Sequence, residues 1–300
     1  MAMTYHNPVL LFESVDGLNI DSEGVYVDVT FGGGGHSREI LKRLGQKGRL
    51  FAFDQDEDAL VNDIDDDRFV LISENFRHFK RFLRFHGVKK VNGILADLGV
   101  SSHQFDEADR GFSTRFNADL DMRMDKRYGL SAFDVVNNYQ EEKLSNIFFQ
   151  YGELRNARAL AKEIVNSRSE KVIKTSFDLK EVLKKFLPKS KEHKILAQIF
   201  QAIRIEVNQE MEVLKEFLTH TPELLVEGGR LSVISYHSLE DRLVKRFIQN
   251  GKFEGEPEKD FYGNVSVPLK KAKKLIVPSQ EEIKINNRAR SAKLRIAIKI

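Results

Sequence analysis

Short apolar runs alternate with helix-like polar segments along the first third of the chain. Four runs are typical of buried strands and span residues 25–29, 49–54, 69–72 and 91–97. They are rich in Val, Ile, Leu and Phe, and the segments between them have helical spacing. Strands that alternate with helices predict a parallel, doubly wound α/β sheet, whose ligands bind at the carboxyl edge of the strands.

The pattern changes after the fourth run. Residues 131–187 have helical spacing, many charges and no convincing strand, which predicts a helical insertion. One long amphipathic helix is expected over residues 195–218. Two glycines at 228 and 229 are expected to break the chain before a fifth strand at 230–235, and a last alternating strand is expected at 294–300.

A run of four glycines follows the first strand directly, in the segment VYVDVTFGGGGH of residues 25–36. Glycines can take positive φ and let a ligand approach the backbone closely, although they can also form an ordinary loop. Ser37 is expected to cap a helix over residues 37–44, whose N-terminal amides would then face the ligand. The junction therefore predicts a site for a small charged ligand.

Two carboxylates are expected at the same edge. Asp54 ends the second strand about twenty residues after the glycines, where an acidic residue accepts hydrogen bonds from a ribose. The G-x-G-x-x-G spacing that starts at Gly32 has Ser37 in place of the last glycine, which favours S-adenosylmethionine over NAD. Asp97 ends the fourth strand and enters a loop of small residues, where its alternative role is a helix cap.

Composition sets outer bounds on this interpretation. The 300 residues are 41% hydrophobic, which is ample for a packed core in one large domain or two. The absence of cysteine excludes disulfides and thiolate metal sites and fits the cytoplasm, and no metal site is expected. Residues 1–20 lack the pattern of a signal peptide, and no apolar run approaches the length of a membrane span.

The net charge of +3 hides an uneven distribution. Residues 270–300 contain ten Lys or Arg against two Glu, whereas residues 54–67 contain eight Asp or Glu and no basic residue. A basic C-terminal segment favours contact with a polyanion such as RNA, and a solvated charged surface is its alternative explanation.

Seven separated blocks carry a family resemblance. The blocks are YHNPVL (5–10), DVTFGGGGHS (28–37), DLGVSS (97–102), RGFS (110–113), LDMRMD (120–125), FQAIRI (200–205) and SYHSLEDR (235–242). In this order they resemble the MraW-type (RsmH family) methyltransferases over almost the whole chain. The resemblance implies S-adenosyl-L-methionine-dependent methylation of N4 of a cytidine in 16S ribosomal RNA of the small subunit, in its decoding region.

The same resemblance implies a fold and a domain organisation. It is a Rossmann-like class I methyltransferase sheet with an inserted helical domain, in agreement with the α/β pattern above. Residues 1–106 and 198–300 would form the cofactor-binding domain, and residues 107–197 the substrate-recognition insertion. One departure is visible, because the family usually has His-Pro ahead of the FQAIRI block and residues 193–200 lack the proline.

Individual site residues follow by motif from the resemblance. The cofactor-binding residues it implies are Gly34, Gly35 and His36 at the methionine end, Asp54 at the ribose, Phe76 on the adenine, and Asp97 and Gln104 to complete the pocket. Two of these have plain alternatives. His36 can be a solvent-facing helix residue, and Phe76 can be ordinary core.

Catalysis requires that the target amine be held in line with the methyl group. Asp97 and Ser101 are the candidates for holding it, and His237 with Glu240 for contacting the flipped base or its phosphate. A helix cap at Ser238, with Asp241 as its partner, is an equal alternative for that last segment. The candidate RNA-contacting cations are Arg288, Arg290, Lys293 and Arg295 in the tail, with Arg110, Arg115, Arg123 and Arg127 beside the insertion.

Two other functions stay open at this point. One is a methyltransferase that acts on a protein or a small molecule, and the other is a nicotinamide-dependent oxidoreductase on the same kind of sheet. The sequence leaves the oligomeric state open, a homodimer included.

Overall fold

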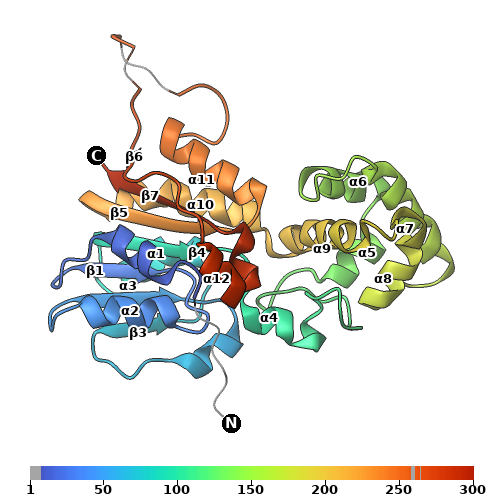
Figure 1. Cartoon of the computed structure of the whole chain (residues 1–300), viewed down its shortest axis with the longest axis horizontal. Helices are drawn as coiled ribbons and strands as arrows, with labels where there is room; N and C mark the ends of the chain where they lie inside the picture. Colours follow the sequence, from blue (N-terminus) through green and yellow to red (C-terminus); the bar gives the residue numbers. More distant parts are fainter. Residues whose placement is uncertain (1–7, 258–260, 264) are drawn as a thin grey trace. The chain divides into compact units, whose positions relative to one another are not determined.

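The computed structural model describes residues 8–257, 261–263 and 265–300, so residues 5–7 of the YHNPVL block lie outside the described residues. The chain divides into two compact units (Figure 1). The sheet unit runs to Gly99 and resumes at Met211, and the helical unit comprises Val100–Glu210. The boundaries expected at residues 107 and 197 lie inside the helical unit.

The sheet unit contains one seven-stranded sheet with the order β3-β2-β1-β4-β5-β7-β6. Its strands are β1 (Val25–Asp28), β2 (Arg49–Phe53), β3 (Phe69–Ile72), β4 (Val91–Asp97), β5 (Leu225–Ser235), β6 (Leu269–Lys271) and β7 (Lys293–Lys299). The first five are parallel, and β7 is antiparallel to both β5 and β6. The α/β class is therefore confirmed. The strand order reverses between β1 and β4, which is where such sheets open a crevice for a ligand.

Helices cover both faces of this sheet, because its strands are apolar on both sides (Figure 1). They are α1 (Leu11–Leu18), α2 (Gly35–Arg43), α3 (Phe79–Phe85), α10 (Glu210–Leu224), α11 (Ser238–Asn250) and α12 (Gln280–Ile285), with short 3-10 turns η1 (Glu57–Asn62), η2 (Phe76–His78) and η5 (Asn287–Ser291). One core joins Val27 and Ile94 of the sheet to Phe217 of α10. The opposite core joins Tyr26 to Ile40 of α2.

Two expectations about strands were wrong in detail. The glycines at 228 and 229 do not precede β5 but lie within it, at a register shift where Val91 pairs with Leu225 and Gly93 pairs with Arg230. Glycine is tolerated there because a bulge needs unusual backbone angles, and Gly228 has φ 78°. The three-residue β6 was missed, since it is too short to show a period.

The helical unit has its own core. It consists of α4 (Ser102–Asp106), η3 (Ala108–Arg110), α5 (Ala132–Asn138), α6 (Glu141–Gln150), α7 (Ala157–Glu170), α8 (Ser176–Leu183), η4 (Lys184–Phe186) and α9 (Glu192–Asn208). Phe148, Leu160 and Ile199 are fully buried in it. Phe105 of α4 packs against the same core, which explains why the unit extends beyond the expected boundaries.

The single helix expected over residues 195–218 is wrong. The chain instead forms α9 and α10, separated at Gln209, which takes a left-handed conformation with φ 51°. Its amide donates to the carbonyl of Glu206 and closes the end of α9. Left-handed ends usually carry glycine, so a glutamine gives no signal in the sequence. In the part of the chain that the structure describes, no helix has the length and apolar character needed to cross a bilayer.

Candidate active site at the carboxyl edge of the sheet

The glycine segment connects β1 to α2 and contributes an open backbone surface. Gly32 has φ 51°, and no atom lies within 4 Å of the position a Cβ would take there. Gly34, with φ 74°, is the N-cap of α2. A Cβ on Gly35 would lie 2.1 Å from Cγ of Pro8, so Gly35 is needed for packing. The missing side chain of Gly32 thus leaves room for a ligand, and contact of Gly34 and Gly35 with the cofactor stays a prediction.

The expected cap at Ser37 is wrong, because α2 already begins at Gly35. The Ser37 hydroxyl donates instead to Oδ2 of Asp28 at 2.7 Å, and the amide of Thr30 donates to the other carboxylate oxygen at 3.1 Å. Asp28 is fully buried, and burial raises its pKa to about 6. This buried carboxylate fixes the path of the chain on both sides of the glycines.

Asp54 lies directly after β2 and faces the glycine segment. Its Oδ2 accepts a hydrogen bond from the amide of Gly32 at 2.7 Å, and its Oδ1 accepts one from the amide of Asp56 at 2.9 Å. Burial raises the pKa of Asp54 to about 6 despite these bonds. Each carboxylate oxygen has a second lone pair, which remains suited to a hydroxyl donor.

Asp97 ends β4 and is held by residues from two neighbouring strands. The Tyr236 hydroxyl donates to Oδ1 of Asp97 at 2.8 Å, and the amide of Asp97 donates to Oγ1 of Thr30 at 2.6 Å. Burial raises the pKa of Asp97 to about 7, while the Tyr236 bond opposes that rise. Sequence reasoning missed Tyr236, because nothing local to residue 236 indicates a partner at residue 97.

His36 is buried at 5% exposure, so its alternative role as a solvent-facing residue is excluded. Its Nε2 lies 3.2 Å from the carbonyl of Val9, which assigns the proton to Nε2. The free Nδ1 lies 3.9 Å from Oδ2 of Asp97. Burial lowers the pKa of His36 to about 4, so the imidazole is neutral and does not supply a cation to Asp97.

The segment after β5 caps α11 in a way the sequence did not indicate. His237, and not Ser238, is the N-cap, with Nδ1 accepting from the amide of Glu240 at 3.4 Å. The Glu240 carboxylate accepts in return from the amides of Tyr236 and His237, at 2.8 and 3.2 Å. The cap with Asp241 as partner is therefore wrong. Contact of His237 with a substrate base stays a prediction.

Phe76 occupies the first position of η2 after β3. It is half-buried, and its ring meets the ring of Phe217 edge-on, with centroids 5.5 Å apart. One edge of Phe76 therefore belongs to the core, and the predicted stacking on adenine stays a prediction.

Ser101 and Gln104 belong to the helical unit and form the capping box of α4. The Ser101 hydroxyl accepts from the amide of Gln104 at 3.2 Å, and Oε1 of Gln104 accepts from the amide of Ser101 at 3.1 Å. A capping role explains both residue types. Their predicted roles toward the amine and the cofactor stay predictions.

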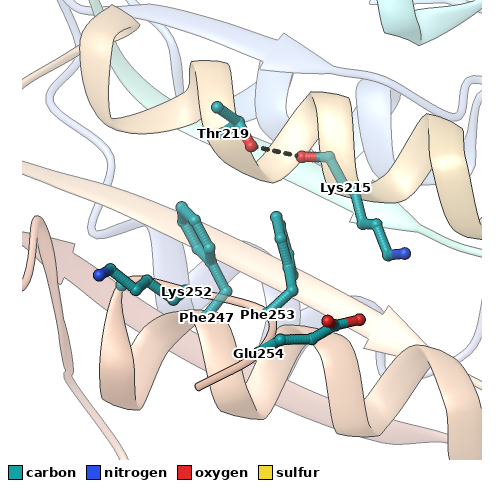
Figure 2. Close-up of a pocket in the computed structure, with 7 residues that line it drawn as sticks. Lys215, Thr219, Phe247, Lys252, Phe253 and Glu254 are labelled. Carbon is teal, nitrogen blue, oxygen red and sulfur yellow. Dashed lines mark hydrogen bonds between the residues drawn. The ribbon is translucent and has the colours of Figure 1, made fainter. Parts of the chain in front are cut away.

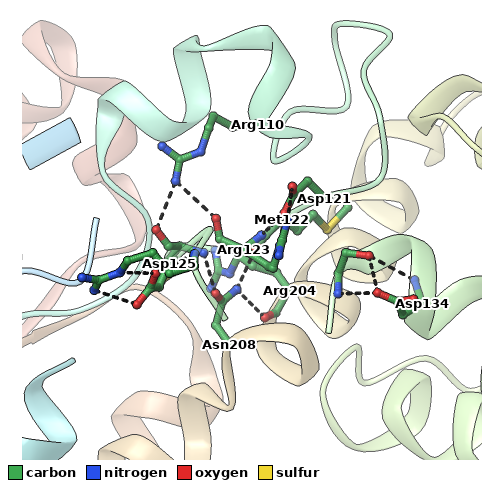
Figure 3. A network of polar contacts seen from close by, with 11 residues as sticks. Arg110, Asp121, Met122, Arg123, Asp125, Asp134, Arg204 and Asn208 are labelled. Carbon is green, nitrogen blue, oxygen red and sulfur yellow. Dashed lines mark hydrogen bonds and ion pairs between the residues drawn. The ribbon is translucent and has the colours of Figure 1, made fainter. Parts of the chain in front are cut away.

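Several cations expected to face RNA are engaged within the protein. Arg295 and Lys293 contact the carboxylate of Asp241 at 2.7 and 3.2 Å. Arg110 is 3% exposed and donates to the carbonyls of Arg123 and Met124 (Figure 3). Arg123 and Arg127 in turn pair with Asp121 and Asp125. These five cations therefore stabilise local structure, and their contact with RNA stays a prediction.

The carboxylates Asp28, Asp54 and Asp97 are desolvated but have no cationic partner in the part of the chain that the structure describes. Within the described residues, no Lys or Arg pairs with any of them, although burial disfavours their charged forms. Buried carboxylates without a cation cluster at functional sites. A glycine turn and desolvated carboxylates at the switch point of a parallel sheet are typical of α/β enzymes that bind a nucleoside, methyltransferases among them.

The chain belongs to the MraW methylase family, whose model matches residues 3–300. A relative from Flavobacterium johnsoniae, named ribosomal RNA small subunit methyltransferase H, is 70% identical over 298 residues and 99% of each chain. A relative of the same name from Bacteroides thetaiotaomicron is 57% identical and covers 99% of this chain and 98% of its own. A solved rRNA methylase from Streptococcus thermophilus has 13% identity over 100% of this chain and 99% of its own, with a TM-score of 0.44. Membership rests on the family model and the sequence relatives.

Proposed function

We propose that this methylase transfers a methyl group from S-adenosyl-L-methionine to N4 of a cytidine in 16S ribosomal RNA. Family membership and the small-subunit rRNA methyltransferases related to it over their whole length support an rRNA substrate. The structural observation that carries the proposal is the pair Asp54 and Asp97. They lie at the ends of β2 and β4, the two strands that flank β1, and within the described residues neither is paired with a Lys or Arg.

The residues present fit S-adenosylmethionine. Its ribose hydroxyls match the free lone pairs of Asp54, and the open face of Gly32 gives room beside them. Its sulfonium and ammonium groups carry the positive charge that the desolvated carboxylates lack. NAD carries a pyrophosphate, and three carboxylates at this edge would repel it.

When bound, S-adenosylmethionine supplies an activated methyl group on a sulfonium, so the chain needs mainly to position the acceptor. A cytosine amine is a poor nucleophile because its lone pair is delocalised into the ring. Asp97 is suited to accept a hydrogen of that amine on Oδ2, since Tyr236 already occupies Oδ1. That hydrogen bond would turn the nitrogen lone pair away from the ring, and Asp97 would hold the proton as the new bond forms.

We assign substrate recognition to the inserted segment, residues 107–197, within the helical unit. This segment contributes most of the buried core of the helical unit, Val100–Glu210. The assembled small subunit is the proposed form of the substrate, which places the enzyme in the cytoplasm.

Transfer of a tritiated methyl group tests the proposed acceptor. Purified enzyme is offered small ribosomal subunits from a deletion strain, free 16S rRNA, and total protein from that strain. Label in the RNA, with N4-methylcytidine found by mass spectrometry, supports the proposal. Label confined to protein or small molecules would overturn the choice of acceptor, and a thermal shift with NAD but not with S-adenosylmethionine would overturn the choice of cofactor.

A further inference from the structure

A pocket lies beside α10 and α11 in the sheet unit, outside the candidate active site. It has a volume of about 460 Å³ and lies between α10 and the last turn of α11 (Figure 2). Its lining is Lys215, Thr219, Phe247, Gly251, Lys252, Phe253 and Glu254. A volume of this size is within the range of small-ligand pockets.

Two aromatic rings form the apolar part of the pocket. Phe247 and Phe253 are stacked, with centroids 5.0 Å apart and an interplanar angle of 20°. Figure 2 shows both rings pointing toward α10. Phe247 is buried at 4% exposure, whereas Phe253 is only partly buried and offers ring surface to the pocket. A flat aromatic surface at the end of a pocket suits a nucleobase, because every base has a π face that can stack on it.

The polar groups at the rim match the rest of a nucleotide. The Glu254 carboxylate is exposed and can accept from the N–H groups on a base edge. Lys215 and Lys252 bring positive charge to opposite sides of the pocket, where each can meet a phosphate beside the stacked base (Figure 2).

A row of lysines continues from the pocket along the edge of the sheet. The pocket residue Gly251 approaches Pro268, since a Cβ on Gly251 would lie 3.1 Å from Cδ of that proline. Pro268 leads directly into β6, the outermost strand beside β7. The exposed lysines here are Lys270, Lys271, Lys273 and Lys274, and none of them has a carboxylate partner among the described residues. Edge lysines can protect a sheet from pairing with another chain, and they also bind phosphates.

We propose that this pocket and the lysines of β6 form a second docking site for single-stranded rRNA, which takes an unpaired base against Phe253 and neighbouring phosphates against the lysines. The inference rests on the proposed function and adds a place where the substrate is held away from the reacting base. The pocket lies about 15 Å along α11 from His237, because ten helical residues separate His237 from Phe247. One nucleotide cannot span that separation, so the site selects a polymer over a small-molecule acceptor.

The test compares two variants of equal charge change in the full-length protein. Lys252→Gln/Lys270→Gln/Lys271→Gln removes three cations from the proposed site, and Lys42→Gln/Lys47→Gln/Lys89→Gln removes three exposed cations elsewhere on the sheet unit. Methylation of 16S rRNA and of small subunits is measured between 50 and 200 mM salt, about the range over which phosphate contacts lose affinity. The first variant is expected to raise KM about tenfold, leave kcat and S-adenosylmethionine affinity unchanged, and reduce the salt slope of RNA binding by about 2.

A third variant, Phe253→Leu, keeps an apolar side chain in the partly buried position. It is expected to raise KM severalfold with an unchanged salt slope, because stacking and not charge is lost. Equal KM and salt slope for the first variant and its control would overturn the docking site and leave the lysines as edge protection. A loss of S-adenosylmethionine affinity in the first variant would also overturn it. Failure of the wild-type enzyme to methylate either RNA would instead contradict the proposed function itself.

Discussion

Two groups of buried or half-buried carboxylates in this protein have opposite electrostatic surroundings. In the helical unit, burial acts to raise the pKa of Asp121, but hydrogen bonds from Arg123 outweigh it and leave that pKa below its ordinary value. Asp125 is held in the same way by Arg127 (Figure 3). At the sheet edge, burial raises the pKa of Asp54 and Asp97 to about 6 and 7, and no arginine among the described residues pairs with either carboxylate.

This difference distinguishes carboxylates that stabilise the fold, Asp121 and Asp125, from carboxylates proposed to bind a ligand, Asp54 and Asp97. The ion pairs of Asp121 and Asp125 stabilise the loop that contains them. Asn208 of α9 stabilises the same loop, because its side-chain amide donates to the carbonyl of Met122 at 2.8 Å. Asp54 and Asp97 have no such ion pair with the residues that the structure describes. Keeping them ionised costs folding free energy, and a bound cation with hydroxyl groups would lower that cost.

The largest effect is expected for Asp97→Asn, set against Asp121→Asn in the helical unit. Asparagine keeps the bond from Tyr236 but removes the acceptor charge, so kcat should fall by about a hundredfold or more. Because folding raises the pKa of Asp97, its protonated form stabilises the folded state. This stabilisation is complete below about pH 4 and is lost as the pH rises through about 7. Asp97→Asn should therefore preserve or raise the melting temperature at pH 8, whereas Asp121→Asn should lower it. A wild-type kcat in Asp97→Asn would remove Asp97 from the chemistry.

Asp54→Ala should weaken S-adenosylmethionine binding by about 1.5–3 kcal/mol, or roughly ten- to a hundredfold, through lost charge-assisted hydrogen bonds to the ribose. Calorimetry measures this directly. Asp65→Ala, an exposed acidic residue in the same acidic stretch, is the control and should leave the affinity unchanged. Equal affinities for the two variants would show that the ribose lies elsewhere.

Cofactor affinity should depend on pH in a direction set by the raised pKa values. A cationic ligand binds the ionised carboxylates, so binding should release protons and strengthen by about tenfold or more per pH unit from pH 5 to 6, more gradually through about pH 7, and level off above about pH 8. Calorimetry in buffers of different ionisation enthalpy counts those protons. Asp54→Asn should flatten the acidic part of the plot of affinity against pH. Proton uptake on binding would contradict the binding of the cofactor to ionised Asp54 and Asp97.

Tyr236→Phe should have a smaller effect. The variant removes one hydroxyl that donates to Asp97, worth about 1 kcal/mol, so kcat should fall about fivefold. Loss of that bond also raises the pKa of Asp97 further, and the acidic limb of the rate profile should move to higher pH. A purely structural role would lower the melting temperature and leave the pH profile in place.

The smallest effect on binding is expected in the helical unit. Arg123→Ala removes the partner of Asp121 and should lower stability by about 0.5–1 kcal/mol, as for other partly exposed pairs. S-adenosylmethionine affinity should not change. A clear loss of affinity would mean that the two groups of carboxylates do not act independently.

Local sequence signals predicted most of the sheet and part of the site. Five of the expected strands coincide with β1 to β5 in order, because buried strands need apolar runs wherever they occur. The glycine segment, Asp54 and Asp97 fall at strand ends, and a parallel sheet brings those ends to one edge. The end of α9 at Gln209 could not be predicted, since its left-handed conformation carries no glycine.

The sequence by itself determined the class of fold, the family and the residues at the ends of the strands. The tertiary structure decided which of the charged residues are partnered. Tyr236 reaches Asp97 across 139 positions, Arg295 reaches Asp241 across 54, and Arg110 is buried against two carbonyls. Strand and helix periods follow from the local geometry of the backbone, whereas the pairing and desolvation of a charge depend on which distant segments pack beside it.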